Sequence, residues 1–258
     1  MKPRVLALFA HPDDVEFRAA GTMLALGEVG YELHYATATS GDLGALSGAR
    51  AKIAATRKAE AKAAAKLLGA KWHGSFAEDM AVIYSTRLLR RAAALVRKVA
   101  PTILLTHPPV DYMEDHTETC RLAVSAAFIR GAPLFRTSPP RAAIEGPIAV
   151  YHSTPHGLVG PLGELRPPAL LVDTAKGHAQ KLAALALHTS QREWLDATQG
   201  LGSYVETADV ESRALARLVP DIEHAEGWTQ HHHLGFGPSG FDPLSDALGA
   251  LIHRVATE

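Results

Sequence analysis

Short apolar segments rich in Val, Ile, Leu and Tyr alternate along this chain with longer segments of helical period. This alternation is typical of βαβ units, in which helices connect the parallel strands of one sheet and cover its faces. It predicts an α/β protein of three layers, with a mostly parallel sheet between two layers of helices. The chain has 258 residues, a length that one such domain commonly reaches, so we predict a single domain over residues 1–258.

The expected elements follow one another in a Rossmann-like order. Strands are predicted at residues 4–9, 32–39, 102–106, 148–152 and 169–173. Helices are predicted at residues 15–28, 50–68, 86–99, 174–188 and 244–255. The Pro- and Gly-rich segments 131–147 and 153–168 are expected to form long surface loops. Between residues 188 and 244 the pattern is irregular.

The composition is that of an ordinary globular protein, with 47% hydrophobic residues, 21% charged residues and a formal net charge of -1. This balance argues against a nucleic-acid partner. No apolar stretch approaches the ~18 residues of a membrane span, and the apolar run near the N-terminus is too short for a signal peptide. Because Cys120 is the single cysteine, an internal disulfide is excluded. We therefore expect a cytoplasmic protein without a membrane partner.

Polar residues follow two of the predicted strands directly. The strand at 4–9 leads into the sequence HPDD, and the strand at 102–106 leads into HPPVDYMEDH. Open α/β sheets build their sites at the carboxyl ends of parallel strands, so these two segments can converge. Imidazole and carboxylate groups are good zinc ligands, and a catalytic zinc usually has three protein ligands and a water. His11, Asp14 and His116 can supply that set.

Asp13 would then lie beside the metal without being a ligand, which is what a general base for a metal-bound water requires. The alternative explanation of HPDD is a capped turn, because Pro-Asp-Asp is also a common helix start. A set of two histidines and one carboxylate suits zinc, and it suits Fe²⁺ as well.

Several motifs resemble those of one known family. AHPDDVEF, followed by AAGT, is similar to the signature of the PIG-L family of zinc-dependent deacetylases, also called LmbE-like. Four further segments match in the family's order, namely TRKAEAKAAAKLLG, DYMEDH, KLAALALHTSQREW and AEGWTQHHHLG. The resemblance covers nearly the whole chain, and the family includes N-acetylglucosaminyl deacetylases. It implies a metal-dependent amidohydrolase that removes an acetyl group from an N-acetylated amino sugar or a related small amide.

The resemblance implies the same three metal ligands and the same general base. It further implies that Arg57 and Asp79 contact the sugar, and that Asp115 lies behind a ligand histidine and orients it. For Arg57 the alternative is an ordinary solvated residue on a helix.

The chain departs from the family at Met113. Many relatives have a histidine there, three residues before the ligand His116, and a thioether cannot stabilise an oxyanion as an imidazolium does. The sequence resembles a branch of the family with the DYM form. We predict that His188 replaces the missing donor, with His107 or a histidine of 231–233 as the next candidates. The alternative is that His188 only caps the helix before it.

Two other functions stay open at this point. One is a metal-dependent hydrolase that acts on an amide outside the sugars, and the other is a protein that binds a sugar or a metal without catalysis. The sequence leaves both a monomer and a homo-oligomer open.

Overall fold

The computed structural model describes residues 2–199 and 204–256 of the chain. The strands are β1 (Arg4–Phe9), β2 (Glu32–Thr37), β3 (Lys71–Trp72), β4 (Ile103–Thr106), β5 (Ala149–Ser153), β6 (Leu170–Asp173), β7 (Ala225–Gln230) and β8 (Ile252–Arg254). The α-helices are α1 (Asp14–Arg18), α2 (Ala20–Glu28), α3 (Arg50–Leu67), α4 (Thr86–Val99), α5 (Glu114–Phe128), α6 (His178–Leu185), α7 (Thr189–Gln199), α8 (Tyr204–Ala216) and α9 (Pro243–Leu248).

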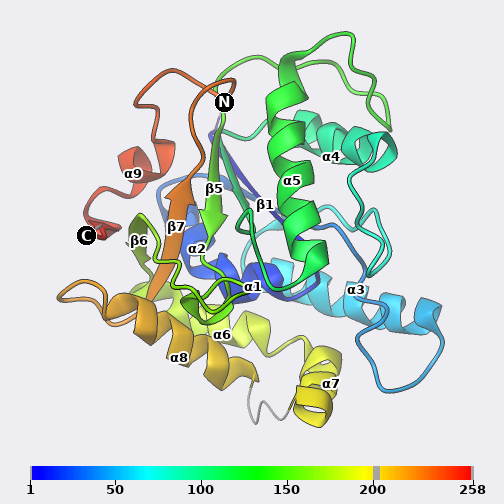
Figure 1. The fold of residues 1–258 in the computed structure, drawn as a ribbon, viewed down its shortest axis with the longest axis vertical. Coiled ribbons are helices and arrows are strands. Elements are labelled where there is room, and N and C mark those ends of the chain that lie inside the picture. The colour runs from blue at the N-terminus through cyan, green and yellow to red at the C-terminus, as the bar shows by residue number, and fades with distance from the viewer. Residues whose placement is uncertain (1, 200–203, 257–258) are drawn as a thin grey trace.

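The eight strands form one sheet in the order β3-β2-β1-β4-β5-β7-β6-β8. β1 pairs in parallel with β2 and with β4, and β3 and β5 extend the parallel part on the two sides. β7 is antiparallel to β5 and β6, and β8 is antiparallel to β6. Helices lie on both sides of this sheet (Figure 1), so the predicted three-layer α/β fold with a mostly parallel sheet is confirmed.

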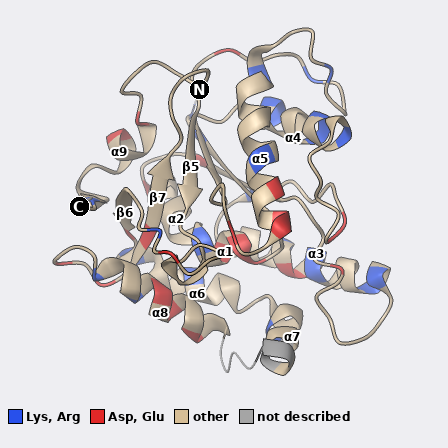
Figure 2. Cartoon of the chain, viewed as in Figure 1, with Lys and Arg blue, Asp and Glu red and all other residues tan. Residues whose placement is uncertain are grey.

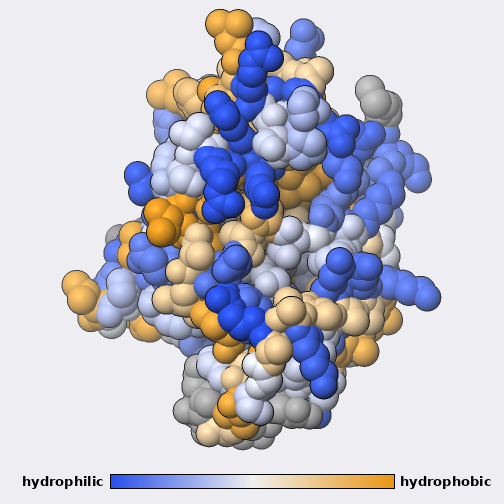
Figure 3. Space-filling view, turned by 90° about the vertical axis from the view of Figure 1, so that its right-hand side faces the viewer, coloured by the Kyte–Doolittle hydropathy of each residue, from blue (hydrophilic) through white to orange (hydrophobic). Residues whose placement is uncertain are grey.

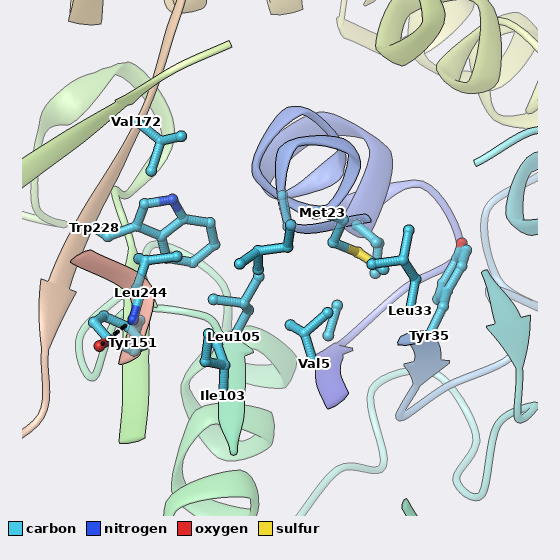
Figure 4. Packing of buried hydrophobic residues seen from close by; sticks show 14 of the residues in the cluster. Val5, Met23, Leu33, Tyr35, Ile103, Leu105, Tyr151, Val172, Trp228 and Leu244 are labelled. Carbon is cyan, nitrogen blue, oxygen red and sulfur yellow. Dashed lines mark hydrogen bonds between the residues drawn. The ribbon is translucent and has the colours of Figure 1, made fainter. Parts of the chain in front are cut away.

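The sheet is buried on both faces, as the uninterrupted apolar sequence of β1 predicts. Alternate residues of β1, beginning with Val5, point to the face covered by α1, α2 and α9. The residues between them, Leu6 and Leu8, point to the face covered by α4 and α5. Figure 4 shows the first of these faces, where Met23 of α2 lies over the strands near Val5. These two cores hold the strand that leads into HPDD in a fixed position.

The helix predicted at 15–28 is interrupted at Ala19, whose φ of −133° ends α1 before α2 begins. A buried carboxylate causes the new helix start. Glu226 of β7 accepts hydrogen bonds from the backbone N–H groups of Gly21 at 2.9 Å and Thr22 at 2.7 Å. These groups belong to the first turn of α2 and have no partner within the helix, so Glu226 satisfies them.

Glu226 is itself paired with Lys181 of α6. Their Nζ and Oε1 atoms lie 2.7 Å apart, and both side chains are only 2% exposed. The pair therefore joins α6, β7 and the start of α2 in the interior. Because a buried charge is costly without its partner, the effect of removing one member should be large.

Replacing Lys181 with Met is expected to lower the free energy of unfolding by about 3–5 kcal/mol, since Glu226 loses its counter-charge. Denaturant unfolding measures the change. The matched control is Lys176→Met, which breaks the pair between Lys176 and Glu28, also 2.7 Å long but on exposed side chains. The control should change stability by about 1 kcal/mol or less. Equal losses in the two variants would contradict the prediction.

The C-terminal third differs most from the prediction. The stretch between residues 188 and 244, expected to be irregular, contains α7, α8 and β7. The helix predicted at 174–188 is shorter, a 3-10 turn at Ala175–Gly177 followed by α6. The terminal helix predicted at 244–255 is wrong in its second half, because Gly249 has a φ of +50° and the chain then extends as β8 along β6.

The surface seen from the side in Figure 3 shows hydrophobic residues in small separate groups among hydrophilic ones. Isolated groups of this kind are normal on a folded protein. Among the described residues, no helix combines the length and apolar character needed to cross a membrane.

Candidate active site

The two polar segments that follow β1 and β4 meet at one edge of the sheet. β1 and β4 are adjacent parallel strands, and β1 has β2 on its other side, so the strand order changes direction here. Such a switch point forms a crevice at the carboxyl ends of the strands. HPDD connects β1 to α1, and the segment after β4 leads into α5, which carries His116.

His11, Asp14 and His116 come together as the sequence predicts. One possible ligand atom from each lies within 4.8 Å of the others. Nδ1 of His11 is 3.4 Å from Oδ2 of Asp14, and Nε2 of His116 is 3.6 Å from Oδ1 of the same carboxylate. Two imidazole nitrogens and one carboxylate thus face a common point.

Two further carboxylates hold the outer nitrogens of these histidines. Oδ2 of Asp115 lies 3.3 Å from Nε2 of His11, and Oδ1 of Asp111 lies 3.0 Å from Nδ1 of His116. With a metal bound, each outer nitrogen would keep its proton and donate it to the carboxylate, and the inner nitrogen would direct its lone pair to the metal. This donor set of two nitrogens and one oxygen fits zinc or Fe²⁺.

The charge of Asp115 is maintained by its contacts. Burial would raise the pKa of Asp115, but hydrogen bonds from His11 and from the backbone N–H of Met80 hold it below its usual value. Burial acts on Asp111 in the same way, and the hydrogen bond with His116 lowers its pKa. No role was predicted for Asp111, although it lies five residues before His116 in the segment HPPVDYMEDH.

Asp111→Asn is expected to weaken binding of the metal at His116 by about 10–100-fold, because the amide accepts the ring proton less strongly than a carboxylate does. Competition with a chelator measures the affinity. Glu114→Gln is the control, since Glu114 is exposed at the start of the same helix. Equal affinity in Asp111→Asn and the control would show that the carboxylate does not support the ligand.

Asp13 has an unusual backbone and a buried side chain. Its φ is 111°, its side chain is 4% exposed, and it lies at the start of α1. Nη2 of Arg57 is 3.5 Å from Oδ2 of Asp13, and the Tyr204 hydroxyl donates a hydrogen bond to the same carboxylate. Burial raises the pKa of Asp13 to about 6, while Arg57 acts in the opposite direction. A carboxylate in this range can accept a proton near neutral pH.

Arg57 is a buried residue, so the alternative of a solvated helix residue is wrong. The residue is 2% exposed, and it donates hydrogen bonds to the carbonyl oxygens of Pro12 at 2.7 Å and Gly41 at 3.1 Å. A side chain at Gly41 would approach the guanidinium to 2.5 Å, which explains the glycine. Arg57 also lines the cavity described below, and its contact with a sugar stays a prediction.

Asp79 shapes the loop after β2. Its Oδ1 accepts a hydrogen bond from the N–H of Gly41 at 2.8 Å, and its Oδ2 accepts one from Leu43 at 3.0 Å. Both carboxylate oxygens are therefore engaged by the backbone. Asp79 lies in the cavity wall, and its contact with a sugar also stays a prediction.

His188 does not face the cavity, which corrects the sequence prediction. Its side chain is completely buried, and Nε2 lies 3.3 Å from Oε2 of Glu16, which also accepts a hydrogen bond from Tyr35. A residue in this position cannot reach a substrate carbonyl. His107 is also unsuitable as the replacement, because its Nε2 accepts a hydrogen bond from the N–H of Ala10.

A cavity of about 400 Å³ opens over the metal-ligand cluster. Its lining residues outside HPDD include Phe17, Arg18, Tyr112, Met113, His156, Gln191, Trp194, Leu195 and Tyr204. α7 supplies Trp194 and α8 supplies Tyr204 to the cavity wall, and neither helix was predicted from the sequence. His156 comes from the predicted loop at 153–168, and no role was predicted for it. Its Nδ1 lies 2.8 Å from Glu211, which also pairs with Arg18 at 2.7 Å.

Comparison with known proteins gives matches of two kinds. Residues 6–128 match the family model PIG-L, described as GlcNAc-PI de-N-acetylase. The chain is 31% identical over 159 residues to a 4-oxalmesaconate hydratase of Pseudomonas putida, a match that covers 58% of this chain and 60% of that protein. It is 27% identical over 205 residues to a probable N-acetyl-alpha-D-glucosaminyl L-malate deacetylase 2 of Bacillus cereus, covering 75% of this chain and 86% of that protein.

Solved structures resemble the fold along most of its length. A 4-carboxy-2-hydroxymuconate hydratase of Pseudomonas putida has a TM-score of 0.73 at 26% identity, covering 89% of this chain and 96% of that one. An N,N'-diacetylchitobiose deacetylase of Pyrococcus horikoshii has a TM-score of 0.74 at 21% identity, covering 94% of this chain and 89% of that one. The second likeness supports the fold alone.

Proposed function

The chain belongs to the PIG-L family, and from this premise we propose that it is a metal-dependent hydrolase that removes the acetyl group from an N-acetylated amino sugar or a related small amide. The observation that carries the proposal is the convergence of His11, Asp14 and His116 at the base of one cavity, with Asp13 beside them. We propose zinc as the metal, although the donor set also suits Fe²⁺. We also propose that residues 1–258 form a single catalytic domain.

The chemistry divides between the metal and Asp13. A metal held by the three ligands would supply a Lewis acid for the amide carbonyl and for the attacking water. Asp13 would accept the proton of that water and pass it to the leaving amine. Arg57 and Tyr204 hold the Asp13 carboxylate in place, so that it can act on a substrate bound over the ligands.

The cavity wall supports an uncharged substrate with an apolar face. Phe17, Trp194 and Tyr204 place aromatic side chains on the side of the cavity formed by α1, α7 and α8. Aromatic walls with a few polar groups are typical of sites for small molecules. The arginines among the described lining residues are already paired, Arg18 with Glu211 and Arg57 with Asp13. These two arginines are therefore already engaged and are poorly placed to pair with a substrate that carries several carboxylates.

The decisive experiment combines metal analysis with a screen for released amine and acetate. The panel consists of N-acetyl amino sugars, their glycosides, and N-acetyl compounds without a sugar. Release from the sugars supports the proposal, and release only from the other amides replaces it with a hydrolase of non-sugar amides. If the protein contains its metal and binds a sugar but releases neither amine nor acetate, the result would favour a non-catalytic binding protein.

A second candidate function follows from the match to the hydratase. The chain is 31% identical to that protein over 159 residues, a higher identity than to the deacetylase, and a hydratase structure at 26% identity is covered over 96% of its length. A base such as Asp13 can also activate water for addition to a carbon–carbon double bond. Loss of ultraviolet absorbance from conjugated unsaturated carboxylates, without acetate release from any amide, would favour this function.

A further inference from the structure

A second group of metal-ligating side chains lies outside the active-site cavity. It consists of His178 at the start of α6, Asp209 on α8 and His224 immediately before β7. We propose that these three residues bind a second divalent metal ion of the zinc class, which holds α8 against α6 and β7. Its three ligands are not residues of the active-site cavity, and metal binding here does not depend on the reaction proposed for that cavity.

The ligand atoms already have nearly the spacing that zinc requires. Oδ1 of Asp209 lies 2.7 Å from Nε2 of His178 and 3.2 Å from Nε2 of His224. Ligand atoms about 2.0–2.1 Å from a tetrahedral zinc lie roughly 3.3 Å from one another. The contact of His224 fits this spacing, and His178 would need to move by roughly half an ångström.

The two imidazole rings are arranged to bind one cation together rather than to carry a positive charge each. Their centroids are 3.6 Å apart with an interplanar angle of 21°, and both Nε2 atoms point to the same carboxylate oxygen. Two protonated imidazoles at this distance would repel each other, so the pair is not expected to carry two positive charges. Neutral imidazole is the form that binds metals.

The Nδ1 atoms of both rings are available to carry the ring proton. Nδ1 of His178 and Nδ1 of His224 are both buried, and neither has a hydrogen-bond partner among the described residues. Without a cation, the Asp209 carboxylate accepts hydrogen bonds from Nε2 of both rings. A bound metal would displace these protons, and each ring could then carry its proton on Nδ1 and direct the Nε2 lone pair toward the cation.

The surroundings are suited to a cation. Asp209 is 26% exposed, so a metal can enter and a water can complete its coordination. Arg213 binds the second oxygen of the carboxylate, with Nε 2.9 Å from Oδ2, and orients Oδ1 toward the histidines. The positive charge of Lys181 is neutralised by Glu226 at 2.7 Å. Acidic residues outnumber basic ones on α8 (Figure 2).

The position of the site gives it a structural consequence. α8 lies beside α6 and β7 in Figure 1, and the three ligands come from these three parts of the chain. The first turn of α8 also carries Tyr204, which lines the cavity and donates a hydrogen bond to Asp13. A metal at His178, Asp209 and His224 would therefore anchor the helix that forms one wall of the active site.

The test begins with a full-length variant in which the active site cannot hold metal, His11→Ala with His116→Ala. Equilibrium dialysis of this metal-stripped variant against Zn²⁺ is expected to give about one bound zinc per chain. Adding Asp209→Asn should reduce the bound zinc to near zero, and adding His178→Gln with His224→Gln should do the same. Zinc should raise the unfolding temperature of the starting variant and not that of the Asp209→Asn form.

The control uses another histidine pair, His34 and His73, which is partly buried. Nδ1 of His34 lies 2.8 Å from Nε2 of His73, between Lys71 and Lys98. His34→Gln with His73→Gln should leave the bound zinc unchanged. The proposal is overturned if the folded starting variant binds no zinc, or if zinc remains bound after Asp209→Asn. Because Asp209 is partly exposed, this variant is expected to fold, and neither result depends on any enzymatic activity.

Discussion

Replacing His116 with Ala is expected to remove the active-site metal and to reduce turnover to the background of the assay, a loss of roughly 10³-fold or more. The variant loses one of three protein ligands and also the ring that Asp111 orients. Metal content should fall by about one ion per chain relative to the unchanged protein. Elemental analysis after dialysis, together with the release assay, measures both effects.

The matched control is His232→Ala. His232 is an exposed histidine of the 231–233 triplet, and it does not line the active-site cavity. The His232→Ala variant should retain the full metal content and full turnover. If His116→Ala keeps both the metal and the activity, the ligand set has been assigned wrongly. If it keeps the metal and loses activity, His116 acts on the substrate and not as a ligand.

The first half of the fold was accessible from the sequence because its elements are defined locally. The predicted bounds of β1 and α4 agree with the structure. β4 begins one residue later than predicted, and β5 is shifted by one residue at both ends. In each case a buried apolar run or a 3.6-residue period is complete within the segment itself. The convergence of His11 and His116 followed from the same topology, since HPDD follows β1 and the segment that leads to His116 follows the neighbouring parallel strand β4.

The interruption at Ala19 was not accessible, because its cause lies about two hundred residues away. The helical period continues through Ala19, and it is the carboxylate of Glu226 that accepts hydrogen bonds from the new helix start. β7 and β8 were missed for a related reason. β8 has only three residues, and β7 has a polar sequence that includes Glu226, Gly227 and Gln230. Both are antiparallel strands, and their pairing with β5 and β6 does not follow from an apolar pattern of their own.

The burial of Arg57 shows why side-chain roles are harder to predict than elements. Arg57 lies on a helix dense in Ala, Lys and Glu, where an arginine is usually solvated. Its partners are the backbone carbonyl oxygens of Pro12 and Gly41. Because every residue has such a group, the sequence does not indicate which of them an arginine contacts. His188 and His156 show the same difficulty, because their contacts decide which one is buried and which one lines the cavity.

Asp13→Asn is expected to lower kcat by about 10²–10⁴-fold while the metal stays bound, because general-base transfer contributes that much. Asparagine is nearly isosteric with aspartate, and it also tolerates the positive φ of 111° at this position, so the start of α1 should keep its shape. The amide cannot accept the proton of the attacking water. Metal analysis and kcat in the same preparation separate the two effects.

Tyr204→Phe is the companion to Asp13→Asn, because it keeps the carboxylate and removes only the hydroxyl that contacts it. Its loss in kcat should be much smaller than that of the Asn variant, since Arg57 still lies 3.5 Å from the carboxylate. A metal-replete Asp13→Asn protein with normal kcat would show that another group accepts the proton. Equal losses in Asp13→Asn and Tyr204→Phe would instead indicate that the position of the carboxylate, set from α8, limits the reaction as much as its basicity does.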